Sequence, residues 1–154
     1  DKKKEIFDED IIALVGDQSR SASESIKFVD LVVNAGSLEK HEAKLTLEVE
    51  ESKKSIIASG NGPVDATFNA IKKITNINSR LKLYQVHAIT AGTDAQGEVT
   101  VRLEDHDITS QAKGSDPDII VASAKAYINA LNRLIFKKTK SAPDKLSEIK
   151  IKGV

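Results

Sequence analysis

The chain has 154 residues, with 23 basic and 23 acidic side chains and no cysteine. A chain of this length buries roughly two thirds of its unfolded surface, so one domain can fold without disulfides. The balanced charge excludes the overall electrostatic attraction that drives non-specific nucleic-acid binding, and the lack of cysteine excludes thiol catalysis and thiolate metal sites.

The N-terminal segment is typical of a connector. We expect a short amphipathic helix over Phe7–Val15, followed by a serine-rich linker from Ser19 onward, so that residues 1–24 precede the folded part. The chain begins on Asp1 and contains no methionine, from which we expect a piece of a longer protein.

An internal repeat dominates the middle of the chain. Two predicted strands with alternating apolar residues lie 54 positions apart (45 to 99). Their apolar positions are Leu45, Leu47 and Val49 in the first strand, and Val99, Val101 and Leu103 in the second. The same offset relates Gly60 to Gly114 and Pro63 to Pro117, so a Gly-x-x-Pro turn follows each strand pair.

Each repeat therefore predicts three strands and a helix. The first unit, residues 25–78, has strands near 26–34, 43–50 and 55–58, a turn over 51–54, and a helix over 63–76. The second unit, residues 79–138, has strands near 81–90, 98–104 and 108–112, a turn over 105–107, and a helix over 117–138. Residues 139–154 are expected to form a flexible C-terminal tail.

The predicted fold class is α+β. It is an internal duplication of a βββα unit, in which two three-stranded sheets are each covered by a helix, preceded by the short connector helix. No run of apolar residues approaches the length that crosses a bilayer, so we expect no membrane partner and a cytoplasmic protein.

Groups for catalysis are scarce. His41, His87 and His106 are isolated in the sequence, without a second ligand at a metal-binding spacing. We predict no catalytic residue and no metal site in this chain.

The two helix starts are the strongest candidates for a binding site. A helix N-terminus has free N–H groups and a partial positive charge, which suit a carboxylate. Asn61 and either Ser115 or Asp116 are the predicted caps, and Val64, Leu81 and Tyr84 could receive an apolar side chain. The alternative is that the glycines only permit tight turns and the prolines only start helices.

Four motifs at these positions resemble one family. They are Gly60–Ala66, Ala91–Gly97, Asp118–Ser123 and Ala126–Arg133, and together they are similar to the C-terminal regulatory domain of 2-isopropylmalate synthases and citramalate synthases. The segment Phe7–Leu14 also resembles that family's connector between a catalytic barrel and the regulatory domain.

The resemblance implies a function. The parent enzyme would condense acetyl-CoA with a 2-oxo acid in a metal-dependent barrel of the same polypeptide, and this domain would bind leucine, or isoleucine in citramalate synthases, as a feedback inhibitor at a homodimer interface. The isolated domain would be inactive, and it would itself bind neither metal nor acetyl-CoA. A purely structural dimerisation module is the other class of function that stays open.

The resemblance also implies the effector contacts. By position they are Gly60, Asn61, Val64, Leu81, Tyr84, Ala88, Ala95, Ser115 and Pro117. The small Ala88 leaves room for the γ-branch of leucine, so leucine is the expected effector, although one methyl group changes affinity by only about 1–3 kcal/mol.

Overall fold

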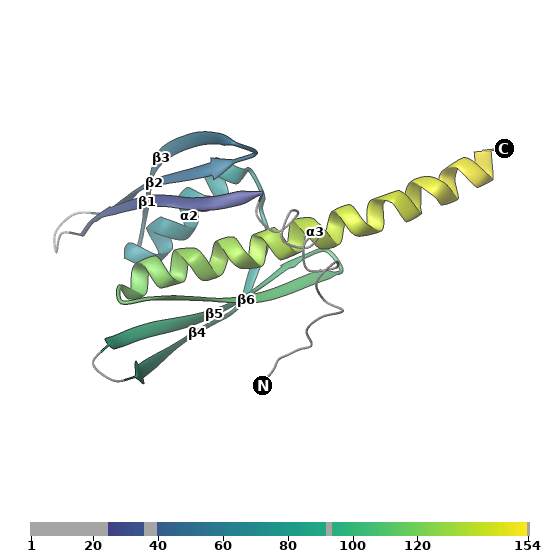
Figure 1. Ribbon diagram of the computed structural model, residues 1–154. Coiled ribbons are helices and arrows are strands. Elements are labelled where there is room, and N and C mark those ends of the chain that lie inside the picture. Colours follow the sequence, from purple (N-terminus) through teal and green to yellow (C-terminus); the bar gives the residue numbers. More distant parts are fainter. Residues whose placement is uncertain (1–24, 36–39, 92–93, 154) are drawn as a thin grey trace.

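The structure is a computed structural model that describes residues 25–35, 40–91 and 94–153. The predicted connector helix and most of the serine-rich linker lie outside these residues. Within the described part, the predicted duplication of a βββα unit is confirmed (Figure 1).

The first unit is an antiparallel sheet followed by a helix. Its elements are β1 (Ile26–Asn34), β2 (His41–Val49), β3 (Ser52–Gly60) and α2 (Pro63–Thr75), with the strands in the order β1-β2-β3. Alternation along β2 buries Ala43, Leu45 and Leu47 on the side that α2 covers.

The second unit repeats this arrangement. Its elements are β4 (Arg80–Ala91), β5 (Asp94–Asp105), β6 (Ile108–Asp116) and α3 (Ile119–Gly153), with the strands in the order β4-β5-β6. On β5, the predicted apolar residues Val99, Val101 and Leu103 are fully buried, because α3 packs on β5 and β6.

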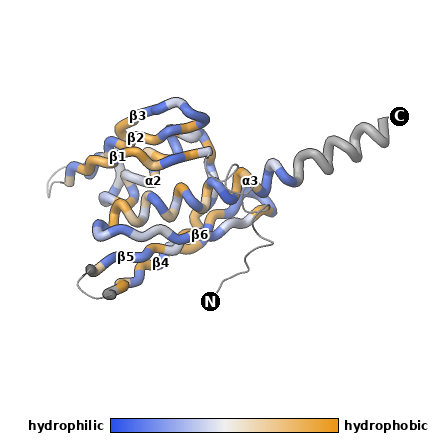
Figure 2. Tube along the Cα trace, in the orientation of Figure 1, coloured by the Kyte–Doolittle hydropathy of each residue, from blue (hydrophilic) through white to orange (hydrophobic). Residues whose placement is uncertain are grey.

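The two helices lie between the two sheets and pack against each other (Figure 1). α2 covers β2 and β3, whereas α3 covers β5 and β6 and also touches β1. Figure 2 shows hydrophobic positions on both sheets and along the coloured part of α3, which together surround one common core. The helices cover the first strand of each sheet least. Val86, on the inner face of β4, is therefore about half exposed, whereas Val32 of β1 is about half exposed because it lies on the outer face opposite Lys44.

Side chains of the helices also protect the outer edges of the sheets. On α3, Asn129 donates a hydrogen bond to the Lys113 carbonyl oxygen at 2.8 Å, and Arg133 donates one to the Gln111 carbonyl oxygen at 2.6 Å. Both carbonyls belong to β6, so these bonds satisfy acceptors that an edge strand would otherwise present to another chain.

The helix of the second unit differs from the prediction at both ends. It begins at Ile119 rather than Pro117, because the carboxylate of Asp118 caps it. Its backbone remains helical to Gly153, where the sequence predicts a flexible tail after Lys138. Pro143 does not end the helix, and most of the residues that follow it have good helix propensity.

The two hairpin turns are tighter than predicted. Glu50 and Glu51 form the first, with φ of 50° and 69°, and β3 already begins at Ser52. The second consists of His106, with φ of 57°, and Asp107. Positive φ at both central residues of the first turn matches the right-handed twist of the strands, but it is unfavourable for a glutamate.

One helix, α3, is apolar over a longer stretch than the runs of apolar residues in the sequence suggested. The segment Ile119–Lys140 of α3 is long and apolar enough to span a bilayer by length and composition. More than half of it, 56%, is buried inside the protein against the sheets, which is the environment of a core helix.

Candidate functional site

Both helices begin at the same end of the molecule (Figure 1). α2 starts with Pro63 at its first helical position, and its N-cap is Gly62 rather than the predicted Asn61. Because glycine has no side chain, the first turn of α2 receives no side-chain cap. The Asp65 carboxylate instead accepts a hydrogen bond from the main-chain N–H of Asn61, at 2.8 Å. The start of α2 is therefore available to a ligand's acceptor group.

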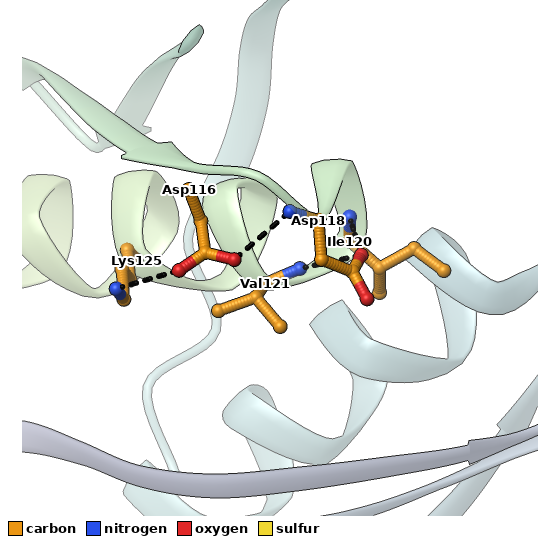
Figure 3. Close-up of polar contacts among 5 residues, drawn as sticks. All are labelled: Asp116, Asp118, Ile120, Val121 and Lys125. Carbon is orange, nitrogen blue, oxygen red and sulfur yellow. Dashed lines mark hydrogen bonds and ion pairs between the residues drawn. The ribbon is translucent and has the colours of Figure 1, made fainter. Parts of the chain in front are cut away.

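The start of α3 is capped by its own chain (Figure 3). Asp118 Oδ1 accepts hydrogen bonds from the N–H groups of Ile120 at 2.8 Å and Val121 at 3.4 Å, so neither Ser115 nor Asp116 is the cap. Asp116 Oδ2 accepts a bond from the Asp118 N–H at 2.9 Å, and its Oδ1 lies 3.1 Å from Lys125 Nζ. With two carboxylates already in place, this helix start is poorly suited to a third.

The pKa of Asp116 reflects these contacts. The hydrogen bond from the Asp118 N–H lowers it most, partial burial opposes this, and Lys125 lowers it further. Asp116 is therefore a carboxylate at neutral pH, and its charge compensates that of Lys125.

Four of the nine predicted effector residues share one face of the second sheet. The register pairs Leu81 with Leu103 and Tyr84 with Val101, whose side chains point toward the helices. By the same alternation, Ala88 opposite Gly97 and Ala95 on β5 lie on this inner face.

Gly97 has a clear steric role there. A Cβ atom built on it would lie 2.0 Å from Cδ1 of Ile119, so glycine lets the first residue of α3 rest on the sheet beside Ala88 without a shift of the Ile119 side chain.

Ser115 is not on this face. It pairs with Glu98 on β5 and is exposed on the outer side of the sheet, away from α3. Pro117 is exposed in the turn between β6 and α3. The structure therefore does not bring Ser115 together with Leu81, Tyr84 and Ala88 within one chain.

Tyr84 connects the two units. Its hydroxyl lies 2.8 Å from Ser123 Oγ on α3, and its ring packs edge to face against Phe68 of α2, with 5.8 Å between centroids. Phe68 also contacts the fully buried Tyr127 of α3, at 4.6 Å. A ligand that moves Tyr84 would therefore perturb both helices.

Sequence reasoning missed Phe68 and Ser123 as parts of this cluster. Phe68 belongs to the predicted apolar stripe of α2, and periodicity alone does not distinguish a residue beside a site from any other core residue. Ser123 is a polar residue among alanines on the buried face of α3, which was the available signal.

The remaining predicted residues lie at the start of α2. Val64 is half-buried against the core, and Asn61 is exposed. A Cβ atom built on Gly60 would lie 2.5 Å from the main-chain nitrogen of Ala66, so Gly60 is needed for the close approach of β3 to α2. This supports the alternative for Gly60, namely that the glycine serves the turn whether or not a ligand binds beside it.

The three histidines lie on separate elements. His87 is exposed on β4, His106 lies in a hairpin turn 3.6 Å from Asp105, and His41 starts β2. Across the described segments, no group of three or more histidine, aspartate or glutamate side chains is arranged to hold a metal ion.

Comparisons with known proteins agree with the family that the motifs resemble. Residues 5–135 match the family described as the LeuA allosteric (dimerisation) domain. The chain is 50% identical over 144 residues to a 2-isopropylmalate synthase from Caulobacter sp. (strain K31), and 48% identical over 143 residues to one from Afipia carboxidovorans. These alignments cover 94% and 93% of the chain but only 27% and 28% of the two relatives.

Proposed function

The chain belongs to the LeuA allosteric (dimerisation) domain family, and we propose that it is the regulatory domain of a 2-isopropylmalate synthase that binds leucine as a feedback inhibitor. It spans little more than a quarter of the curated relatives it matches. In this proposal, the condensation of acetyl-CoA with a 2-oxo acid, and the divalent metal it needs, belong to a catalytic barrel elsewhere in the same cytoplasmic polypeptide.

One observation carries the proposal for leucine. The start of α2 has no side-chain cap, and it lies at the same end of the molecule as the start of α3, which rests on the inner face of the second sheet. The helix N-terminus suits the carboxylate of an amino acid. Ala88, which is exposed on that inner face, suits a branched aliphatic side chain. Leu81 lies seven residues earlier on β4, roughly 20 Å away along an extended strand, so one leucine does not contact both within one chain.

The two helix starts have unequal roles in this proposal. The sequence suggested a symmetric pair, but the Asp118 cap leaves α2 as the start that receives the carboxylate. Tyr84 lies beside the effector, and its contacts with Phe68 and Ser123 pass a displacement to both helices. Inhibition then results from a higher affinity of leucine for one arrangement of the domain than for the other.

The homodimer belongs to the same proposal. The family is described as a dimerisation domain, and apolar side chains are exposed on the first strand of each sheet: Val29, Val32, Leu81, Val86 and Ile89. A symmetric dimer would bury such surface. Ser115, on the outer face, contributes to an effector site in this proposal only across the dimer interface.

The experiment is isothermal titration calorimetry of the chain with leucine, isoleucine and leucinol. We expect leucine to bind and leucinol, which lacks the carboxylate, not to bind. Isoleucine binding more tightly than leucine would instead indicate the citramalate synthase type. Leucinol binding as tightly as leucine would exclude a carboxylate site at the start of α2.

A pair of variants on β4 locates the site. Ala88→Leu adds bulk to the inner face, whereas His87→Leu adds it to the outer face at the next position of the same strand. We expect Ala88→Leu to weaken leucine binding by at least about tenfold, a change of 1.4 kcal/mol, and His87→Leu to leave it unchanged. Gly60→Val is unsuitable because of the clash with Ala66.

Light scattering on the same samples separates sensing from scaffolding. An Ala88→Leu variant that remains a dimer but no longer binds leucine supports a sensor domain. A dimer that never binds any branched-chain amino acid supports a purely structural dimerisation module.

A further inference from the structure

A groove of about 280 Å³ lies between β1 and α3. Two apolar residues that line it, Ile26 and Ile128, are almost fully buried, whereas the third, Phe28, is only partly buried. None of the nine predicted effector residues lines the groove, so it is separate from the site proposed for leucine. The described residues thus leave part of the Phe28 side chain uncovered in a hollow of the surface.

The polar side chains that α3 contributes to this groove are already engaged. Lys125 Nζ lies 3.1 Å from Asp116 Oδ1. Asn129 donates a hydrogen bond to a carbonyl oxygen of β6, and Asn132 is bonded to the main chain of Ile26. A charged or strongly polar ligand would have to compete with these contacts, so an apolar side chain is the better occupant.

The first described residues of the chain lie beside the groove. The Ser25 hydroxyl donates a hydrogen bond to Asn132 Oδ1 at 3.1 Å, and both Asn132 and the residue after Ser25, Ile26, line the groove. Asn132 therefore fixes the point at which residues 1–24 join the domain. The connector thus meets the domain at the groove itself.

The connector has an apolar stripe at helical spacing. Phe7, Ile11 and Leu14 recur three or four positions apart in the predicted connector helix, whereas residues 8–10 are acidic. A helix as short as Phe7–Val15 is not stable by itself in water, so it needs an apolar surface that covers its stripe. The family match begins at residue 5, so this stretch belongs to the same family pattern as the two sheets.

The linker is long enough for the connector helix to reach the groove. Residues 16–24, nine in number, separate the helix from Ser25. Fully extended, they would span at most about 30 Å, whereas the predicted helix itself would be only about 14 Å long. The linker can therefore reverse direction and let the helix lie along the groove.

We propose that the connector helix docks into this groove of its own chain, with Phe7 and Ile11 covering Phe28. Its acidic residues would stay in water. α3 would then contact the connector at the groove and Tyr84 through Ser123, so one helix would join the connector to the site proposed for leucine. The docking itself is independent of leucine binding.

The test is disulfide cross-linking of the whole chain, which has no cysteine of its own. Asp10→Cys, at the margin of the apolar stripe, is combined either with Asn129→Cys at the groove or with Lys73→Cys, which is exposed on α2 outside the groove. We expect the first pair to form a disulfide within one chain at least about tenfold faster than the second, because docking raises the effective concentration of the two thiols. Equal rates would overturn the proposal. A disulfide formed mainly between two chains would overturn it as well, because the groove would then hold the connector of a second copy.

Matched serine variants test the apolar contact by thermal unfolding of the whole chain. Ile11→Ser should lower the melting temperature by roughly 2–4 °C, because it removes an apolar side chain from the groove. Ala13→Ser lies away from the stripe and reduces helix propensity, so it should lower the melting temperature no more than about half as much. If the two variants were equally unstable, helix propensity alone would explain the loss, and the contact with the groove would be refuted.

A double-mutant cycle with Phe28→Ala locates the contact. In the Phe28→Ala chain, Ile11→Ser should lower the melting temperature by less than about half of its effect in the native chain, because its partner is already gone. An unchanged effect would place Ile11 elsewhere. If Phe28→Ala does not fold, the cross-linking rates decide. None of these measurements requires leucine, so a failure of leucine to bind would refute the proposed function and leave the docking result standing.

Discussion

The most informative stability prediction concerns Asn132 of α3. This buried side chain bonds to the start of β1, more than 100 positions earlier in the chain. Its Oδ1 accepts bonds from the Ile26 N–H at 3.0 Å and the Ser25 hydroxyl at 3.1 Å, and its Nδ2 donates to the Ile26 carbonyl oxygen at 2.9 Å. The amide thus occupies the place that a residue of a neighbouring strand would take.

The substitution Asn132→Leu keeps the size of the side chain and removes all three bonds. An unsatisfied buried main-chain group costs about 1–3 kcal/mol, and Ile26 would have two. Leucine recovers part of this through apolar contact, so we expect a net loss of about 3 kcal/mol. At 2–4 °C for each kcal/mol, the melting temperature should fall by roughly 6–12 °C.

The assay is urea unfolding followed by circular dichroism, with differential scanning calorimetry for the melting temperature. Asn129→Leu is the matched control, because Asn129 is exposed and makes a single bond to an edge carbonyl. It should cost less than about 1 kcal/mol. If Asn132→Leu were as stable as Asn129→Leu, the contact with Ile26 would not hold β1 to the second unit.

Three further predictions follow from the turns, the glycines and the ion pair. Replacing Glu50 and Glu51 by Asn and Gly should raise the free energy of unfolding by about 1–2 kcal/mol, because both positions have a positive φ that is unfavourable for glutamate. An unchanged urea midpoint would argue against backbone strain in this turn. Gly114→Ala should cost about 2–3 kcal/mol, because its Cβ would lie 2.4 Å from an α3 main-chain nitrogen. Gly62→Ala, at an N-cap in extended backbone with open space, should change stability by less than about 0.5 kcal/mol, because the loss of chain entropy in the unfolded state offsets the poorer cap. Equal urea midpoints for the two variants would contradict this. The pKa of Asp116 is lowered, so this carboxyl binds a proton less readily in the folded state than in the unfolded state. The stability that its charge adds is therefore fully present above the ordinary pKa of 3.8, and it is lost as the pH falls through the lowered pKa. The stability difference between Asp116→Asn and the native chain should therefore be constant at neutral pH and shrink below about 3.8, and a difference independent of pH would refute the role of the charge.

The sequence determined the repeat and most of the strands. Alternation around Leu45 and Val99 is enough to define half-buried strands, because a side-chain period of two requires one face to be covered. The first helix was also predictable, since Pro63 can start a helix and Asn76, with φ of 55°, ends it. These features depend on neighbouring residues, which the sequence displays directly.

Only the tertiary structure decided which predicted site residues share a face. Local patterns do not show that Ser115 lies outside while Ala88 lies inside, because this depends on how β4 and β6 pair with β5. The contacts of Asn132 with Ile26 and of Tyr84 with Ser123 join residues far apart in the chain. Such contacts arise from packing of the two units, and no periodicity in either unit records them.

The unequal helix starts show the same division. The two Gly-x-x-Pro turns look alike as sequences, yet one leaves α2 without a side-chain cap, and the other places Asp118 as the cap of α3. Within its repeat, α3 begins two residues later than α2 does. The start of α3 is therefore already neutralised by Asp118, whereas the start of α2 is open to a carboxylate. The Asp118 carboxylate sets that start by capping α3, and the folded chain then places Ile119 against Gly97.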